Sequence, residues 1–266
     1  MIYRDCAGRI NSIGAPITMK RLFISAVILC CAHTFYGQTT SSPAAESTTT
    51  SAAPAKRTEV YSITFIHAAA GKAAALESWA KKSNSSGSGS TAQHGMILRH
   101  EAGSPWDYVA IADEGSKATI DPAGNPAGVA LRPLMDWHDD TFVNGPAWAE
   151  FAKQMDLDES SGKPKSPDSV YVVTVYRPIV GQEDAVEKFL SEPPGSGDLT
   201  AGTVLMQHLE GGAWRFCTIT RYKNYKDYGA SEASAVAETG KGKGGWWTLR
   251  QLCSFHNDTV AVPLGE

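Results

Sequence analysis

The sequence predicts an α+β fold that is built from two consecutive copies of one unit. The first observation is a motif near the end of each half, L-R-x-L-x-x-aromatic-H-x-D-T-apolar, which occupies residues 131–142 and again residues 249–260. The second is the spacing His-x-x-Gly-x-x-Trp, which starts at His100 and again at His208. Because self-similarity of this kind is the signature of repeated structural units, the duplication predicts the architecture before any single residue is interpreted.

Each copy shows the same order of expected elements. In the first copy, residues 58–155, a β-branched and aromatic strand at 60–66 precedes an Ala-rich helix at 72–82, and two further strands follow at 95–100 and 106–112. A looser stretch and the duplicated motif complete the copy, with a short last strand expected at residues 141–144. The order is therefore β-α-β-β-α(β), which is the ferredoxin-like order.

The second copy, residues 170–266, repeats this pattern after a charged, Pro-containing linker at residues 156–169. Its first strand is expected at 170–176, the hairpin strands follow as in the first copy, and a short last strand is expected at 259–263. Each copy has about 100 residues, which is enough for one small core.

The N-terminal region predicts export. Residues 19–21 are Met-Lys-Arg and precede an apolar run of about 11 residues, which has the length of a signal-peptide core and is too short to span a bilayer. We expect residues 1–37 to be an upstream extension and a signal peptide, and residues 38–57, rich in Ser, Thr, Pro and Ala, to be a disordered tether. The protein is thus expected to be periplasmic or secreted, without a transmembrane span in the mature chain. A buried helix and a lipid anchor are the alternatives.

Composition excludes several classes of function. The chain has 266 residues, 42% of them hydrophobic and 20% charged, as in globular proteins. The net charge of −4 and the lack of a basic cluster argue against a nucleic-acid partner. The sequence has no P-loop, HExxH, GxSxG or CxxC motif.

Cysteine usage gives no disulfide framework. Three of the five cysteines, Cys6, Cys30 and Cys31, fall in the segment that is expected to be removed. Cys217 and Cys253 remain, which permits one disulfide but no Cys-rich zinc site. Free, packed thiols are the favoured interpretation.

With its tandem ferredoxin-like units, the chain from Val60 onward resembles the dimeric α+β barrel superfamily. This resemblance implies that the two sheets pair into one barrel within the chain, either as a monomer or in a homodimer. The superfamily includes monooxygenase-like proteins and haem-binding chlorite-dismutase relatives. The resemblance rests on element order and duplication, so it transfers no catalytic residue. The cofactor is unknown: the sequence requires none, and haem enters only through the resemblance.

The motif places His138 near Asp140, and His256 near Asp258. On a strand, residues i and i+2 share a face and could converge on a ligand, whereas on a helix they would diverge. Two side chains do not complete a metal site, so no metal is predicted. The favoured interpretation is structural: the His closes a helix C-terminus and the Asp caps a turn.

Two arginines and two further histidines complete the candidate ligand-binding residues. Arg132 and Arg250 are expected on helices away from the His face, in surface ion pairs, with anion binding as the alternative. His100 and His208 lie near the ends of the second strands. A core or rim position with satisfied hydrogen bonds is favoured for them, and an acid–base or haem-ligating role is the alternative.

The functional hypothesis is an exported tandem barrel protein that binds a small molecule in a pocket between sheet and helices. The first alternative is a monooxygenase-like or haem-dependent oxidoreductase, and the second is a non-catalytic structural or interaction module. The sequence leaves open whether the protein is an enzyme. A cavity of roughly 300 Å³ or more would favour binding over the structural alternative.

Overall fold

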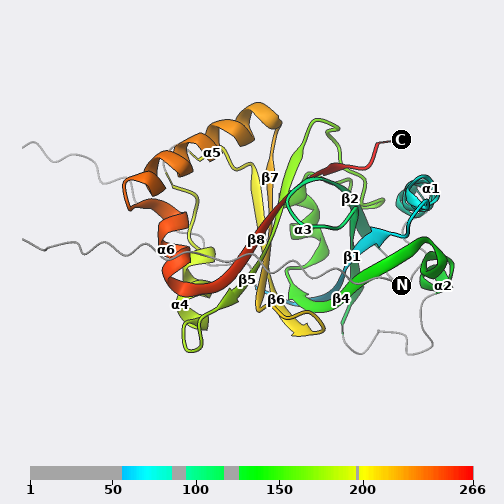
Figure 1. Cartoon of the computed structure of the whole chain (residues 1–266), viewed down its shortest axis with the longest axis horizontal. Coiled ribbons are helices and arrows are strands. Elements are labelled where there is room, and N and C mark those ends of the chain that lie inside the picture. The colour runs from blue at the N-terminus through cyan, green and yellow to red at the C-terminus, as the bar shows by residue number, and fades with distance from the viewer. Residues whose placement is uncertain (1–55, 86–93, 117–125, 196–197, 266) are drawn as a thin grey trace, which may run out of the picture. The chain divides into compact units, whose positions relative to one another are not determined.

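The computed structural model describes residues 56–85, 94–116, 126–195 and 198–265 (Figure 1). The predicted upstream extension and signal peptide, and nearly all of the predicted tether, lie outside these residues, so export stays a prediction. Among the helices of the described residues, none combines the length and the apolar character that crossing a bilayer requires.

Eight strands form one closed antiparallel barrel in the order β1-β3-β2-β8-β5-β7-β6-β4. The last strand of each half pairs with the other half: β4 with β6, and β8 with β2. The predicted α+β barrel within a single chain is therefore confirmed. The strands are β1 (Glu59–Ala68), β2 (His94–Ala102), β3 (Tyr108–Gly115), β4 (Met135–Gly145), β5 (Val170–Pro178), β6 (Gly202–Glu210), β7 (Phe216–Tyr222) and β8 (Cys253–Pro263).

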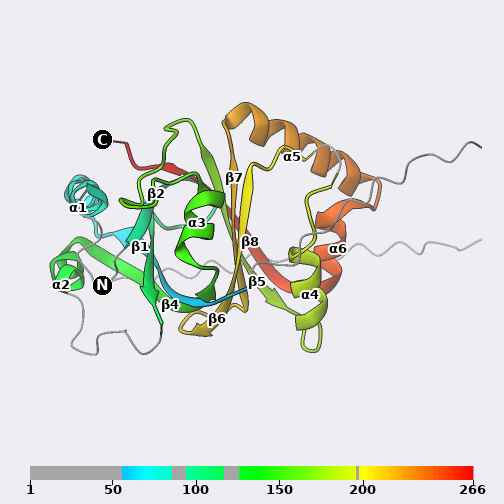
Figure 2. The same ribbon diagram turned by 180° about the vertical axis from the view of Figure 1, so that it is seen from behind.

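The helices form two groups outside the barrel wall, and one helix packs against the barrel core. Helices α1 and α2 accompany the strands of the first half, and α4, α5 and α6 accompany those of the second half (Figures 1 and 2). The bounds are α1 (Ala73–Ser85), α2 (Pro126–Leu131), the 3₁₀ helix η2 (Arg132–Leu134), α3 (Trp148–Met155), α4 (Glu183–Leu190), α5 (Tyr225–Gly240) and α6 (Gly244–Leu252).

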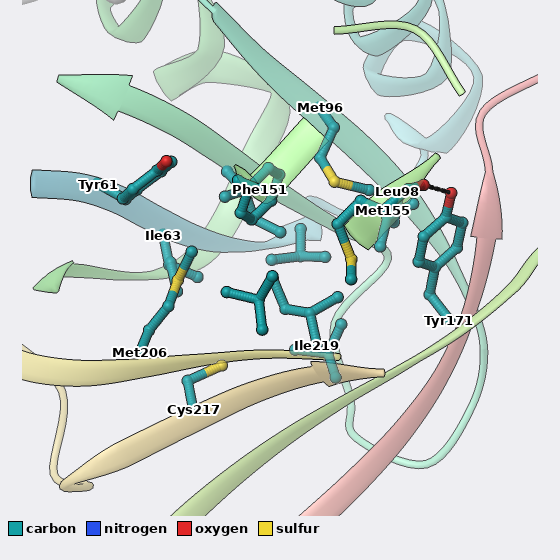
Figure 3. Packing of buried hydrophobic residues seen from close by; sticks show 14 of the residues in the cluster. Tyr61, Ile63, Met96, Leu98, Phe151, Met155, Tyr171, Met206, Cys217 and Ile219 are labelled. Atoms are coloured by element: carbon teal, nitrogen blue, oxygen red, sulfur yellow. Dashed lines mark hydrogen bonds between the residues drawn. The ribbon is translucent and has the colours of Figure 1, made fainter. Parts of the chain in front are cut away.

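The barrel interior is a packed core. Since side chains alternate along a strand, one set of residues from both halves points inward, and helix α3 adds Phe151 and Met155 to it (Figure 3). The Tyr171 hydroxyl donates a hydrogen bond to the Met155 carbonyl oxygen at 2.9 Å, which fixes α3 against the second half. Because these side chains fill the barrel interior, a ligand site would lie on the outer faces of the barrel.

The last strands are longer than predicted. Instead of short strands at 141–144 and 259–263, β4 and β8 each span 11 residues and start at Met135 and Cys253. The reason is tertiary pairing: β4 forms a ladder along the whole of β1, which supplies backbone partners to a polar segment with no strand signal of its own. The interpretation that His138 closes a helix is therefore wrong, because His138 lies inside β4.

Two helices were not anticipated. Helix α3 follows β4 at the end of the first half, and α5 occupies the stretch that was expected to be loose. Helix α5 begins at a good capping residue, because the Asn224 side chain accepts a hydrogen bond from the Asp227 backbone N–H at 2.9 Å. This helix forms one side of a cavity on the second half of the barrel.

Candidate functional site

A cavity of about 890 Å³ lies between the second half of the barrel and helices α4, α5 and α6. Its floor comes from the outward-facing residues of β5 and β7, among them Tyr176, Thr218 and Tyr222. Their neighbours Cys217 and Ile219 point into the barrel core, as strand alternation requires. The cavity thus lies between sheet and helices, and its volume is in the range of small-molecule sites.

Aromatic and aliphatic side chains form one part of the cavity walls. Phe189 comes from α4, Trp246 and Leu249 from α6, and Leu205 from β6. Helix α5 faces them with a polar side, on which Ser231 and Glu232 line the cavity. This arrangement can hold the apolar body of a molecule on one side and bind its polar groups on the other.

The floor provides hydroxyl groups that stay protonated. The hydroxyls of Tyr176 and Thr218 lie 3.2 Å apart and share a hydrogen bond. Burial raises the pKa of Tyr176 well above its ordinary value. Burial, and then the charges of Asp198 and Glu232, raise the pKa of Tyr222 to about 12. At neutral pH the floor therefore offers O–H groups and no phenolate.

Among the carboxylates of the described lining, Glu232 is the one with a raised pKa. It is partly buried, and burial raises its pKa, followed by the negative charges of Asp258 and Asp198. Its neighbour Ser231 is engaged, since the Ser231 hydroxyl accepts from the Leu199 N–H at 2.8 Å. Among the described residues Glu232 itself has neither a hydrogen-bond nor an ion-pair partner. A desolvated, unpaired carboxylate in a cavity is a candidate functional group.

Arg57 is the positively charged side chain of the described lining, and an ion pair neutralises its charge. The Arg57 Nη1 atom lies 2.7 Å from the Glu187 Oε1 atom, in an ion pair that is partly shielded from solvent. The guanidinium also reaches Gln207 at 3.5 Å. The described lining therefore has no unpaired cation to bind an anionic ligand.

None of the eight predicted candidates lines this cavity, but the second copy of the motif lies beside it. The Asp258 carboxylate accepts a hydrogen bond from the Thr174 hydroxyl at 2.8 Å on the outer face of the sheet. The His256 Nε2 atom lies 3.7 Å from an Asp258 oxygen. The charge of Asp258 raises the pKa of Glu232, so it influences the cavity without lining it.

The first copy of the motif forms a pair on the surface. The His138 Nδ1 atom lies 2.7 Å from the Asp140 Oδ2 atom, with 45% and 58% of the two side chains exposed. The expectation that residues i and i+2 share a face on a strand is correct, whereas the capped turn is wrong. Within the described ranges, no three His, Cys, Asp or Glu side chains come together as a metal site.

The described residues do not provide the ion pairs that were expected for the two arginines of the motif. Arg132 lies in η2 and Arg250 in α6, and both are exposed. In the part of the chain that the structure describes, neither has a carboxylate within ion-pair distance, and neither lines the cavity. Their repetition has no structural explanation here.

His100 and His208 point toward the inside of the barrel, beside Trp106 and Trp214. The ring centroids lie 5.4 Å apart in the first pair and 5.8 Å in the second. The Nε2 atoms of both histidines are buried without a hydrogen-bond partner in the described residues. The expectation of satisfied histidines is therefore wrong, and both lie on the opposite side of the sheet from the cavity.

The repeated His-Gly-Trp spacing is explained by the junction between the halves. Gly103 and Gly211 have φ values of +118° and +112°, and each packs on the last strand of the other half. A Cβ atom on Gly211 would lie 2.2 Å from the Asp140 carbonyl oxygen, and one on Gly103 would lie 2.5 Å from that of Asp258. Only glycine fits this close approach at positive φ. This repetition therefore reflects packing.

The described strands of the first half do not form an equivalent polar floor. Where β7 has Thr218 and Thr220, the corresponding positions of β3 are Ala110 and Ala112, as the matching strand registers show. The position of Tyr176 is taken by an isoleucine that packs in an apolar cluster under α1. That cluster includes Ile66, Leu76, Ala80, Ile97, Tyr108, Leu131 and Leu264. The two copies have thus diverged at the site.

The two cysteines of the described residues offer no accessible nucleophile. Cys217 and Cys253 are both free and buried, which confirms the prediction of packed thiols. Burial raises the pKa of Cys217 to about 12.

Comparison with known proteins gives structural matches and no sequence matches. No family model matches the chain, and no curated protein matches it. A candidate monooxygenase from Fusobacterium nucleatum subsp. nucleatum has a similar structure, with 8% identity, coverage of 78% of this chain and 93% of that chain, and a TM-score of 0.52. An anthrone oxidase-like protein is 12% identical over 80% of this chain and 96% of that chain, with a TM-score of 0.49. A candidate chlorite dismutase is 14% identical over 78% and 97%, with a TM-score of 0.43. At 8% identity, the similarity to the Fusobacterium nucleatum protein shows the fold alone. The chain has the dimeric α+β barrel fold, and no specific family is assigned.

Proposed function

We propose that this protein binds a small organic molecule in the cavity of its second half, and that it belongs to the exported proteins. The observation that supports binding is the cavity itself, about 890 Å³ between β5–β7 and helices α4–α6, with apolar walls and a polar floor. Such a combination of apolar surface with a few converging polar groups is typical of ligand sites. The divergence of the first half supports a role for the second half in particular.

Haem does not fit this cavity. Its iron needs an axial ligand from His, Cys, Met or Tyr. The described lining contains no His, Cys or Met, and its phenols Tyr176 and Tyr222 are held in the protonated form by burial. His100 and His208, the candidates that point into the barrel, face a packed interior. The proposed function therefore does not involve haem.

A cofactor-free monooxygenase-like activity is the alternative. Its support is the partly buried, unpaired carboxylate of Glu232, which is the kind of group that removes a proton from a bound substrate. The monooxygenase description of one structural neighbour belongs to that protein and is analogy at the level of the fold. Consumption of dioxygen that depends on a bound ligand would distinguish this alternative from binding alone.

The test is ligand-observed NMR with a chemically diverse set of small organic molecules. The decisive variant is Thr220→Trp, because Thr220 lines the cavity from β7 and an indole there would project into it and obstruct the floor. The matched control is Lys226→Trp, at an exposed position of α5 outside the lining. We expect molecules that bind the wild type and the control to lose binding to Thr220→Trp. Binding that is equal in all three proteins would overturn the proposal.

A further inference from the structure

The described lining of the cavity carries mostly negative charge, which limits the class of ligand that the cavity can accept. Five carboxylates of the described residues line it, and two of them are matched by lysines: Glu150 lies 3.7 Å from Lys153, and Glu238 lies 2.7 Å from Lys241. The others are Glu192, Asp198 and Glu232. Since Arg57 is bound to Glu187, an anionic ligand would meet uncompensated negative charge.

Glu232 lies where this negative charge is most shielded from water. The titratable groups that face it are Asp198 from the loop before β6, Tyr222 from β7, Tyr228 from α5 and Asp258 from β8. All four are acids or phenols, so no described neighbour neutralises the Glu232 carboxylate. A positive charge brought by a ligand would fill this role, because opposite charges attract more strongly in a partly desolvated site than in water.

We propose that the cavity is selective for an organic amine, whose ammonium group pairs with Glu232 while its apolar body lies against Phe189 and Trp246. This inference rests on the proposed function, because it names the ligand class of the same cavity. An ammonium group donates charge-assisted hydrogen bonds to a carboxylate, and these are about twice as strong as neutral ones. The phenol and threonine hydroxyls of the floor line the same cavity and can bind further polar groups of the ligand.

The pairing has a consequence for the pH dependence of binding. The deprotonated form of Glu232 binds an ammonium group, and burial, followed by the neighbouring acids, raises the pKa of Glu232 in the free protein. Binding of an amine therefore releases a proton in the range around the raised pKa of Glu232. Affinity for an amine is expected to rise with pH through this range and then to level off, while affinity for a neutral analogue stays constant.

Three probes of matched shape test the inference by titration calorimetry with the full chain: 2-phenylethylamine, 2-phenylethanol and 3-phenylpropionate. At pH 7.5 we expect the amine to bind at least about tenfold more tightly than the alcohol, and the carboxylate to bind most weakly. Glu232→Gln keeps the shape of the side chain and should reduce the amine to the affinity of the alcohol. Asp227→Asn, on the same helix but outside the lining, is the control and should leave the preference unchanged.

The outcomes separate the two proposals. Equal affinities for amine and alcohol, or a preference that survives in Glu232→Gln, would overturn the amine inference, while loss of binding in Thr220→Trp would still support the cavity as a ligand site. If none of the three probes binds, the amine inference falls. In that case the result with the diverse set of molecules decides whether the proposed function falls with it.

Discussion

The Thr141 hydroxyl accepts a hydrogen bond from the backbone N–H of Gly212 at 2.9 Å, across the junction between the two halves. Its counterpart Thr259 lies 3.4 Å from the Ser104 backbone nitrogen. Both threonines are 2% exposed. The last strand of each half thereby holds the hairpin of the other half, which gives the threonine of the duplicated motif a structural role.

Replacement of Thr141 by valine is expected to destabilise the barrel. Valine keeps the shape but removes the acceptor, which leaves the partly buried Gly212 N–H without its partner. We expect a loss of about 0.5–1.5 kcal/mol. Thr259→Val is the matched control and should cost less, because its hydrogen bond is longer. Urea denaturation measures both values. Equal losses in the two variants would contradict the role that we assign to the shorter hydrogen bond.

Two glycine substitutions should act in opposite directions. In Gly211→Ala the new methyl group would collide with the Asp140 carbonyl at a positive φ, so we expect a loss of more than about 2 kcal/mol. Gly229, inside α5, has open space around it, and Gly229→Ala should stabilise the protein by about 0.5–1 kcal/mol. Thermal unfolding of the two variants distinguishes the effects. A stable Gly211→Ala would mean that the hairpins do not pack on the opposite half as described.

The fold could be predicted largely because its evidence is local and repeated. The duplicated spacings and the strand-like segments specify two β-α-β-β units, and pairing into one barrel then follows from the resemblance. The length of β4 could not be predicted, since its polar stretch around His138 becomes a strand only by pairing with β1. Helix α5 was missed because its sequence, rich in Ala, Ser and Gly, carries a weak apolar pattern.

The sequence predicted the location of the cavity between sheet and helices, but not the residues that line it. A pocket between sheet and helices was expected, yet the residues singled out by repetition, such as His138 and His256, lie outside it. Repetition marks what both halves share, and here that includes the packing of Thr141 and Gly211. The cavity instead depends on differences between the halves, such as Tyr176 and Glu232, which a search for shared residues overlooks.

The two described cysteines are expected to be unreactive in the native protein. Cys217 lies inside the barrel core with a pKa raised to about 12, and burial also raises the pKa of Cys253, so neither forms much thiolate at neutral pH. Alkylation with iodoacetamide, followed by mass spectrometry of the peptides that contain each cysteine, checks this. Both should be labelled after denaturation, which serves as the control. Fast labelling of native Cys217 would contradict the packed interior.

Glu232→Gln is expected to stabilise the protein at neutral pH. Folding raises the pKa of Glu232 above its ordinary 4.5, so ionisation is less favourable in the folded protein than in the unfolded chain. This destabilisation is absent when the pH lies below the pKa that Glu232 has in the unfolded chain. It is complete once the pH exceeds the raised pKa of Glu232 in the folded protein. Because the side chain is partly exposed, we expect a gain of only about 1–2 °C in Tm at pH 7, and none near pH 4.

Glu238→Gln is the control with the opposite sign, since the hydrogen bond from Lys241 lowers the pKa of Glu238 and its removal should slightly reduce Tm. Calorimetric melting at both pH values measures the two shifts, and a lower Tm for Glu232→Gln at pH 7 would show that its carboxylate has a partner in the folded protein.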